Sequence, residues 1–197
     1  MEKYKLTFGG KLLSYDKKLA ATSSDKIFGM WFLPSQGELI QMYNELDKED
    51  VGDFQDETYW SSSEGQVITT GRQINFGFNG AQSSGSKEKL NPVRPVRTFT
   101  LIESSPTYAL RDVSPSGGFI FSVEAVNGGY QYYEAAPNDL PGTYPWSNIT
   151  DQLVGNRQDD NNWNFGRGFT NSYRIVNQPG HTNSAAKACI DYVLIIT

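Results

Sequence analysis

Cysteine and histidine are nearly absent from this 197-residue sequence, which contains one of each, Cys189 and His181. A single cysteine cannot form a disulfide within the chain, and its alanine-rich surroundings predict a buried structural thiol on a helix. His181 follows Pro179-Gly180, so we expect it to form a hydrogen bond within a turn. No nucleophile-elbow pattern is present, and the sequence indicates neither a catalytic set nor a cofactor.

Long apolar runs and an excess of positive charge are also lacking. No stretch is long enough to cross a bilayer and nothing at the N-terminus resembles a signal peptide, so we expect no membrane insertion and folding in a cytoplasm. The formal net charge of -5 disfavours a surface for nucleic acid. Calcium is not expected either, because the acidic stretch at 159–162 lacks the ligand spacing of an EF-hand loop.

The composition supports a folded, β-rich chain. Hydrophobic residues make up 38% of the sequence and aromatic residues 13%, which suffices for a core, and nineteen glycines indicate many turns. The length allows one large or two small domains. A short linker at 103–107 divides the chain into the segments 1–103 and 104–197.

The clearest local signal is a helix predicted over 35–46. Ser35 and Glu38 form a capping box, in which each side chain can bond to the backbone amide of the other. Pro34 keeps the helix from starting earlier. Leu39, Tyr43 and Leu46 then recur at spacings of four and three. This spacing places their side chains on one helix face.

Alternating patterns predict strands and hairpins around this helix. In the first segment, Asn79-Gly80 predicts a two-residue hairpin turn, since both positions tolerate positive φ. A polar loop is expected at 82–89, and Pro95 predicts that the following strand lies at a sheet edge or a bulge. The predicted strands are 4–8, 11–15, 72–78 and the hairpin 117–136, and two further short helices are predicted at 169–176 and 184–192.

Three motifs in the first segment carry a resemblance to a known family. Trp31-Phe-Leu-Pro-Ser35, Tyr59-Trp-Ser-Ser-Ser-Glu64 and Val93-Arg-Pro-Val-Arg97 occur in this order. Together they resemble a large family of domains of unknown function in the C-type-lectin-like superfold, which also includes formylglycine-generating enzymes and the variable proteins of diversity-generating retroelements. The resemblance covers about residues 28–100.

The second segment resembles the part that normally precedes these motifs in such proteins. Because it follows them here, the two halves are in permuted order. In this order both halves resemble proteins encoded by phages of gut bacteria and their prophages. The stretches that carry this resemblance include Gly117-Gly-Phe-Ile-Phe121, Tyr133-Glu-Ala-Ala-Pro137, Pro145-Trp-Ser-Asn-Ile149 and the segment 180–189.

The resemblance implies an α+β, C-type-lectin-like fold of short antiparallel strands and long loops, circularly permuted, with both halves packed as one unit. Formylglycine-generating enzymes use a cysteine pair, which this chain lacks, so their activity does not carry over and no enzymatic function is expected. Arg94 and Arg97 of the third motif are expected to pair with a buried acidic group or to donate to loop carbonyls. In the retroelement variable proteins, the region between the second and third motifs displays ligand-binding residues. The corresponding ligand-binding candidates are Arg72, Asn75, Asn79 and Gln82, with Ser61 and Ser63 beside them.

These features favour a non-enzymatic structural protein of a phage virion, as a head or tail fibre or a decoration component. Its expected partners are other virion proteins, further copies of itself (a trimer is favoured) and a host-surface glycan. Two alternatives stay open. One is a glycan-active enzyme that uses an acidic pair such as Glu134 and Asp139, and the other is a prophage-encoded cytoplasmic binding protein.

Overall fold

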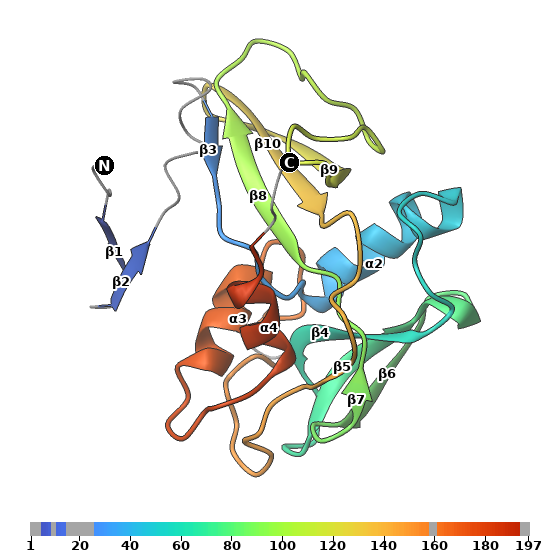
Figure 1. Ribbon diagram of the computed structural model, residues 1–197, viewed down its shortest axis with the longest axis vertical. Helices are drawn as coiled ribbons and strands as arrows, with labels where there is room; N and C mark the ends of the chain where they lie inside the picture. Colours follow the sequence, from blue (N-terminus) through green and yellow to red (C-terminus); the bar gives the residue numbers. More distant parts are fainter. Residues whose placement is uncertain (1–4, 9–10, 15–25, 158–160, 194–197) are drawn as a thin grey trace.

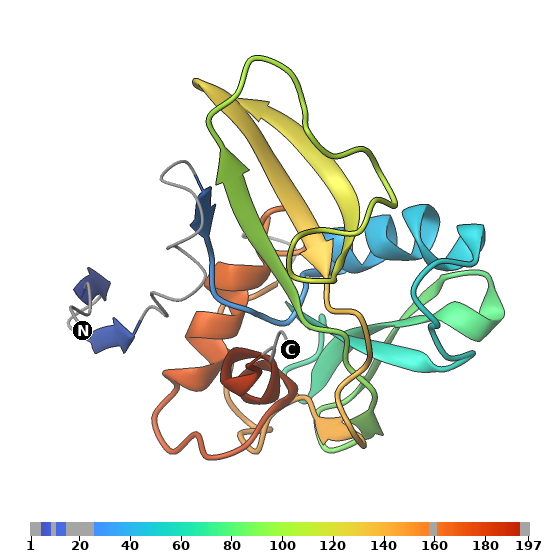
Figure 2. The same cartoon turned by 45° about the horizontal axis from the view of Figure 1, so that its top comes forward.

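A computed structural model describes residues 5–8, 11–14, 26–157 and 161–193, which form an α+β fold of small antiparallel sheets and a few helices. A four-stranded sheet lies in the upper half of Figure 1, and Figure 2 shows its strands β8, β10 and β9 side by side. In spatial order this sheet consists of β3 (Lys26–Phe28), β8 (Val96–Leu101), β10 (Gly129–Ala135) and β9 (Phe119–Val126).

A three-stranded antiparallel sheet lies at the lower right of the molecule in Figure 1. Its strands are β4 (Thr58–Glu64), β5 (Thr70–Asn75) and β6 (Ala81–Ser86), in that order. The smaller pairs are β1 (Lys5–Phe8) with β2 (Lys11–Ser14), and β7 (Leu90–Asn91) with β11 (Tyr144–Pro145). The predicted N-terminal hairpin is therefore present within 5–8 and 11–14, while residues 4 and 15 lie outside the described residues.

Within the described residues, three helices pack against these sheets. Helix α2 (Gln36–Glu45) contacts β4 and β5 of the lower sheet and β9 of the upper sheet, while α3 (Gly168–Val176) and α4 (Ala185–Asp191) pack together against β4. Short 3₁₀ helices are η1 (Asp47–Glu49) and η2 (Phe76–Phe78). None of the helices in the described part of the chain is long and apolar enough to cross a membrane.

Helix α2 begins with the predicted capping box. The Glu38 amide donates to Ser35 Oγ at 3.3 Å, and the Ser35 amide donates to Glu38 Oε2 at 2.6 Å. The predicted apolar face is also confirmed, because Leu39 and Leu46 are fully buried and Tyr43 is half-buried. This face lies in a core cluster that includes residues from both sequence segments, so α2 is fixed by its cap and by its packing.

The two sequence segments contribute to the same sheet and the same core. Strand β8 from the first segment pairs along its whole length with β10 from the second, from Val96 opposite Ala135 to Leu101 opposite Tyr130. One apolar cluster contains Leu39 of α2 together with residues of β9 and β10. Folding of either segment alone would leave this sheet half-formed.

Three strand predictions in the first segment are wrong in detail. Strand β5 ends at Asn75, and η2 with the turn Asn79-Gly80 makes a five-residue connection to β6, although both turn residues have the predicted positive φ, 51° and 67°. The expected loop at 82–89 is largely strand β6. It was missed because a polar strand with one solvated edge shows no apolar alternation.

The third correction concerns Pro95. Strand β8 lies between β3 and β10, so it is not an edge strand. Pro95 precedes the first strand residue, where its missing N–H costs no ladder hydrogen bond. Val96 instead exchanges backbone hydrogen bonds with Phe32 just before α2.

In the second segment, the predicted hairpin and both helices are present as β9–β10, α3 and α4.

Candidate functional site

Ser61 and Ser63 of the second motif lie on β4 and are fully buried. Ser61 Oγ donates to the Arg72 carbonyl at 2.9 Å. Ser63 Oγ donates to the Asn162 carbonyl at 3.1 Å and accepts from the Gln36 amide at 3.0 Å. Both hydroxyls already have hydrogen-bond partners in the interior, and both side chains are fully buried. The prediction that they contact a ligand is therefore wrong. They join β4 to β5, to the loop at Asn162 and to the start of α2.

Arg72 is the centre of a polar cluster at the surface. Its Nε donates to Gln36 Oε1 at 2.7 Å, and its Nη1 donates to Ser84 Oγ at 3.1 Å. Gln36 Nε2 in turn donates to Gln82 Oε1 at 2.5 Å. The guanidinium carbon of Arg72 lies 4.4 Å from the centre of the Trp163 ring, a cation–π arrangement. We call these five residues the Arg72 cluster.

The strand pairing explains why the cluster forms. Successive side chains of a strand point to opposite faces, so Arg72 and Ile74 share one face of β5. Ile74 is buried in the core beside α2. Ser84 lies opposite Arg72 and Gln82 lies opposite Ile74, which brings both onto the same face. The capping box places Gln36 at the first position of α2, within reach of Arg72.

The other two predicted candidates lie apart from this cluster. Asn75 belongs to the opposite face of β5 and is half-buried, whereas Asn79 is exposed in the turn before β6. The structure therefore brings together two of the six sequence candidates, Arg72 and Gln82. Gln36, Ser84 and Trp163 were missed. Trp163 is the one aromatic residue in the otherwise polar stretch 161–164. This was the signal in the sequence that could have indicated it.

The Arg72 cluster has the chemistry of a recognition surface. The exposed Gln82 amide can donate and accept, and the Arg72 guanidinium supplies further donors, while the buried Gln36 amide is bonded to both of them. Gln82 is exposed, while Arg72 and Trp163 are half-buried. Partial burial lowers the pKa of Arg72 from its ordinary value. The five side chains include no carboxylate and no imidazole, so the cluster itself offers no general acid or base.

Glu134 and Asp139, the acidic pair of the enzyme alternative, are each bound to a separate arginine. Glu134 is fully buried and pairs with Arg97. Asp139 Oδ1 lies 2.5 Å from Arg94 Nε, and its Oδ2 accepts from Tyr59 Oη at 2.6 Å. Both arginines are thus paired with acidic groups, and Arg94 also donates to the Gly52 and Ala136 carbonyls, so both expected kinds of partner occur. These interactions pair all four charges within the fold, with Asp139 partly exposed.

A third buried ion pair was not predicted from the sequence. Lys87 Nζ lies 2.7 Å from Glu64 Oε1, and both side chains are fully buried. Lys87 Nζ also donates to the Gln152 carbonyl at 3.0 Å, and the Val154 amide donates to Glu64. The pair joins the end of β4 to the residue after β6 and to the loop at 152–154.

Glu38 is a buried carboxyl close to the cluster, at the start of α2. Burial raises its pKa to about 7, and hydrogen bonds from Ser35 and from the Gly168 and Gly166 amides partly oppose this increase. Gly168 fits tightly here, because a Cβ at this position would lie 2.2 Å from Glu38 Oε2. The carboxyl is enclosed by backbone and has the role of a helix cap.

His181 and Cys189 have the structural roles expected from the sequence. His181 Nε2 lies 2.9 Å from Oγ of Ser184, the N-cap residue of α4. Cys189 is fully buried on that helix, and burial raises the pKa of its thiol. The acidic stretch at 159–162 lies partly outside the described residues. Within the described residues no group of three His, Cys, Asp or Glu side chains is placed to hold a metal ion.

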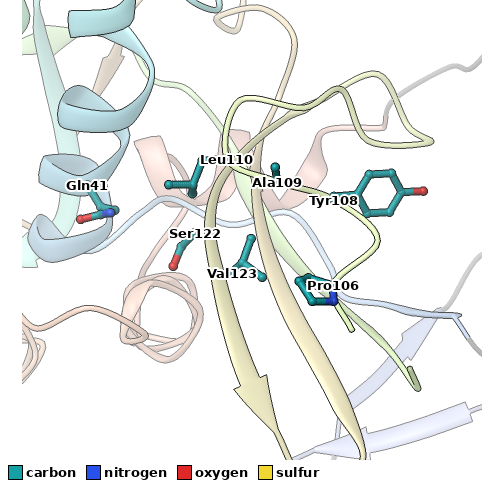
Figure 3. A pocket seen from close by; sticks show the side chains of 7 residues that line it. All are labelled: Gln41, Pro106, Tyr108, Ala109, Leu110, Ser122 and Val123. Carbon is teal, nitrogen blue, oxygen red and sulfur yellow. The ribbon is translucent and has the colours of Figure 1, made fainter. Parts of the chain in front are cut away.

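A shallow, open hollow of about 340 Å³ lies elsewhere, between α2 and the segment 106–110 (Figure 3). In Figure 3, Leu110 and Val123 lie near its centre and Tyr108 points away from Gln41. Tyr108 packs against Phe99 and Tyr132. No charged side chain lines the hollow, so we place the candidate site at the Arg72 cluster.

Comparisons of the chain with family models, with curated proteins and with solved structures found no match.

Proposed function

We propose that this chain is a non-enzymatic structural protein of a phage virion, a head or tail fibre or a decoration component, and that a C-type-lectin-like domain displays its binding surface. Support for this assignment comes from the resemblance of the three motifs and of their permuted order. The α+β architecture and the helix that follows the Trp31–Ser35 motif are compatible with it. In this proposal the host surface supplies the ligand, a glycan.

The observation that carries the binding role is the Arg72 cluster. Sugars present several hydroxyl groups, which require donors and acceptors at fixed positions, and apolar C–H faces, which suit aromatic rings. The cluster presents the Gln82 amide, the Arg72 guanidinium and the Trp163 ring, and the buried Gln36 amide holds Gln82 and Arg72 in place. Because hydrogen bonds already hold these side chains in place, binding costs less conformational entropy than it would with free side chains.

A virion role also suits a weak binding site. A single contact through a few amide groups is weak, but many copies on one particle bind together, because each later contact is effectively intramolecular. The proposal therefore includes assembly with other virion proteins and a symmetric homo-oligomer. In this proposal the protein is located in the virion, which is assembled in the cytoplasm of the bacterial host.

The test of the virion assignment is mass spectrometry of purified particles of a phage whose genome encodes this chain. The expected result is recovery of its peptides in constant ratio to the major capsid protein through successive density gradients. A matched control is a phage enzyme made in the same infected cells, which should be lost on purification. If this chain is lost together with that enzyme, the virion assignment is wrong and a binding protein of the infected cytoplasm takes its place.

A further inference from the structure

Arg72 is a half-buried cation whose charge is not neutralised by any carboxylate of the described residues. Its hydrogen bonds go to the neutral side chains of Gln36 and Ser84, at 2.7 and 3.1 Å. The ring of Trp163 lies against the guanidinium and is neutral as well. A charge that is partly removed from water is unfavourable unless a partner compensates it, so Arg72 is suited to an anion from outside the chain.

The buried cations in the described part of the chain already have such partners. Lys87, Arg94 and Arg97 each form an ion pair with a carboxylate of the same chain. For Arg72, burial lowers the pKa from its ordinary value, which reflects the cost of holding the charge away from water. The contrast indicates that the fold compensates the charges of its interior and leaves that of Arg72 open.

Two buried carboxyl groups close to the cluster have other roles. Glu64, whose backbone carbonyl accepts from the Trp163 ring N–H at 2.7 Å, pairs through its side chain with Lys87. Glu38 caps the start of α2. Both side chains are fully buried, so neither is available at the surface. An anion that pairs with Arg72 has to approach from the outer side of the cluster.

Hydrogen-bond donors remain open on this outer side. Nε and Nη1 of Arg72 are bonded, whereas its Nη2 has no hydrogen-bond partner among the described residues. Gln82 accepts through Oε1 from Gln36, which leaves its exposed amide nitrogen Nε2 free to donate. Because Gln36 bonds to both side chains, it holds the two donor groups on one surface.

A carboxylate fits this small set of donors better than a phosphate does. The planar guanidinium matches the two oxygens of a planar carboxylate. Phosphate sites commonly use the free amides at a helix N-terminus. Here the first three amides of α2 already donate to acceptors on Ser63, Trp163 and Ser35, at 3.0, 2.8 and 3.3 Å. The cluster therefore offers the guanidinium and one side-chain amide, without a cradle of backbone amides.

We propose that the ligand of the Arg72 cluster is an acidic glycan, in which the carboxylate of a uronic acid or another acidic sugar pairs with Arg72. This inference rests on the proposed function, which supplies the glycan and the host surface. In the complex the carboxylate accepts from Arg72 Nη2, and Gln82 Nε2 donates to the same sugar. The Trp163 ring keeps the guanidinium in position. A neutral glycan would leave the Arg72 charge uncompensated and binds more weakly.

The experiment measures binding of the full chain to surface polysaccharide purified from the host bacterium, in three forms. The first is unmodified, the second has its carboxyl groups reduced to alcohols, and the third has its phosphate removed with hydrofluoric acid. We expect carboxyl reduction to weaken binding by about tenfold or more, since it removes the anion and keeps the sugar hydroxyls. Removal of phosphate should leave the affinity unchanged.

Arg72→Gln tests the same ion pair from the side of the protein. It removes the charge and keeps a polar side chain, so we expect equal and weak binding of the unmodified and carboxyl-reduced forms. The matched control is Lys48→Gln, which removes one positive charge at an exposed position beyond the other end of α2. It should keep the wild-type preference for the unmodified form. Thermal melting first shows whether each variant is folded.

The results with wild type decide the inference even if a variant fails to fold. Equal binding of the unmodified and carboxyl-reduced forms overturns the acidic-glycan inference and leaves the proposed glycan binding intact. Loss of binding on removal of phosphate alone also overturns it, because the anion is then a phosphate. A chain that binds none of the three forms contradicts the proposed function, and the inference falls with it. An unchanged preference in folded Arg72→Gln overturns the role of Arg72.

Discussion

Arg97 on β8 and Glu134 on β10 lie directly opposite each other in the antiparallel register and form a buried ion pair. The Ser116 hydroxyl donates to both oxygens of the same carboxylate, at 2.9 and 2.7 Å, and Ser114 Oγ also donates to it. The Arg97 guanidinium carbon lies 4.5 Å from the centre of the Trp31 ring. The third motif of the first segment is thereby bound to the second segment at the centre of their shared sheet.

This relationship predicts that the two segments do not fold separately. Fragments 1–103 and 106–197 would each lose half of the β8–β10 pairing and expose residues of one apolar cluster. We expect neither fragment alone to show a cooperative thermal transition by circular dichroism, and a mixture of the two to recover one. Cooperative unfolding of each isolated fragment, with the stability of the intact chain, would instead establish two independent domains.

Removal of one partner of the Arg97–Glu134 pair should be costly. Arg97→Ala leaves a fully buried carboxylate without its cation, a change that typically destabilises a protein by about 3–5 kcal/mol. The matched control is Arg111→Ala, because Arg111 is 40% exposed and its pairs with Glu45 and Glu49 lie at the surface. Such pairs contribute about 0–1 kcal/mol. The free energies of unfolding are measured with a denaturant. Equal decreases for both variants would show that the buried pair contributes no more to stability than the surface pairs do.

Helix α2 should depend strongly on its buried face. Leu39 is fully buried in the apolar cluster that joins α2 to β9 and β10, so Leu39→Ala should lower the free energy of unfolding by about 2–5 kcal/mol. Trp31→Ala, in the motif before the helix, should have an effect of similar size. Val67→Ala is the control, because Val67 is 60% exposed. Losses below about 1 kcal/mol for both core variants would contradict the packing of the helix.

Glu38 should make the stability dependent on pH. Its pKa is about 7 in the folded chain against an ordinary value of 4.5, so between these values the folded state binds a proton that the unfolded state has released. The resulting stabilisation is fully present below about pH 4.5 and is lost as the pH rises to about 7.

Glu38→Gln remains neutral and retains an oxygen for the Ser35 amide. Its free energy of unfolding relative to wild type should therefore increase across this window and stay constant above it. Glu88→Gln, at an exposed position, should show no such trend. Parallel stability curves for wild type and Glu38→Gln between pH 4 and 8 would contradict the raised pKa.

Local signals in the sequence predicted the elements that depend on local chemistry. The Ser35–Glu38 cap, the β9–β10 hairpin and helix α4 all arise from residues close together in the chain. Strand β6 was missed because its pairing with β5, and not an apolar pattern, makes it a strand.

The Arg72 cluster could be predicted only in part, for a similar reason. Arg72 and Gln82 were identified from the motif resemblance. Gln36 and Trp163 are brought to them from distant parts of the chain by α2 and by the turn at 161–164, through contacts such as those of Ser63 with both segments. No spacing rule in a single sequence indicates such contacts.

Binding of the purified chain to glycans from the surface of the host bacterium is the most direct test of the proposed role. Wild type should be compared with Arg72→Ala/Gln82→Ala and with the matched surface control Arg111→Ala/Gln152→Ala, after thermal melting has shown that all three are folded. We predict that the first variant loses affinity by about tenfold or more, equivalent to about 1.4 kcal/mol, and that the control binds as wild type does. Equal binding by all three proteins would contradict the assignment of the Arg72 cluster as the recognition surface.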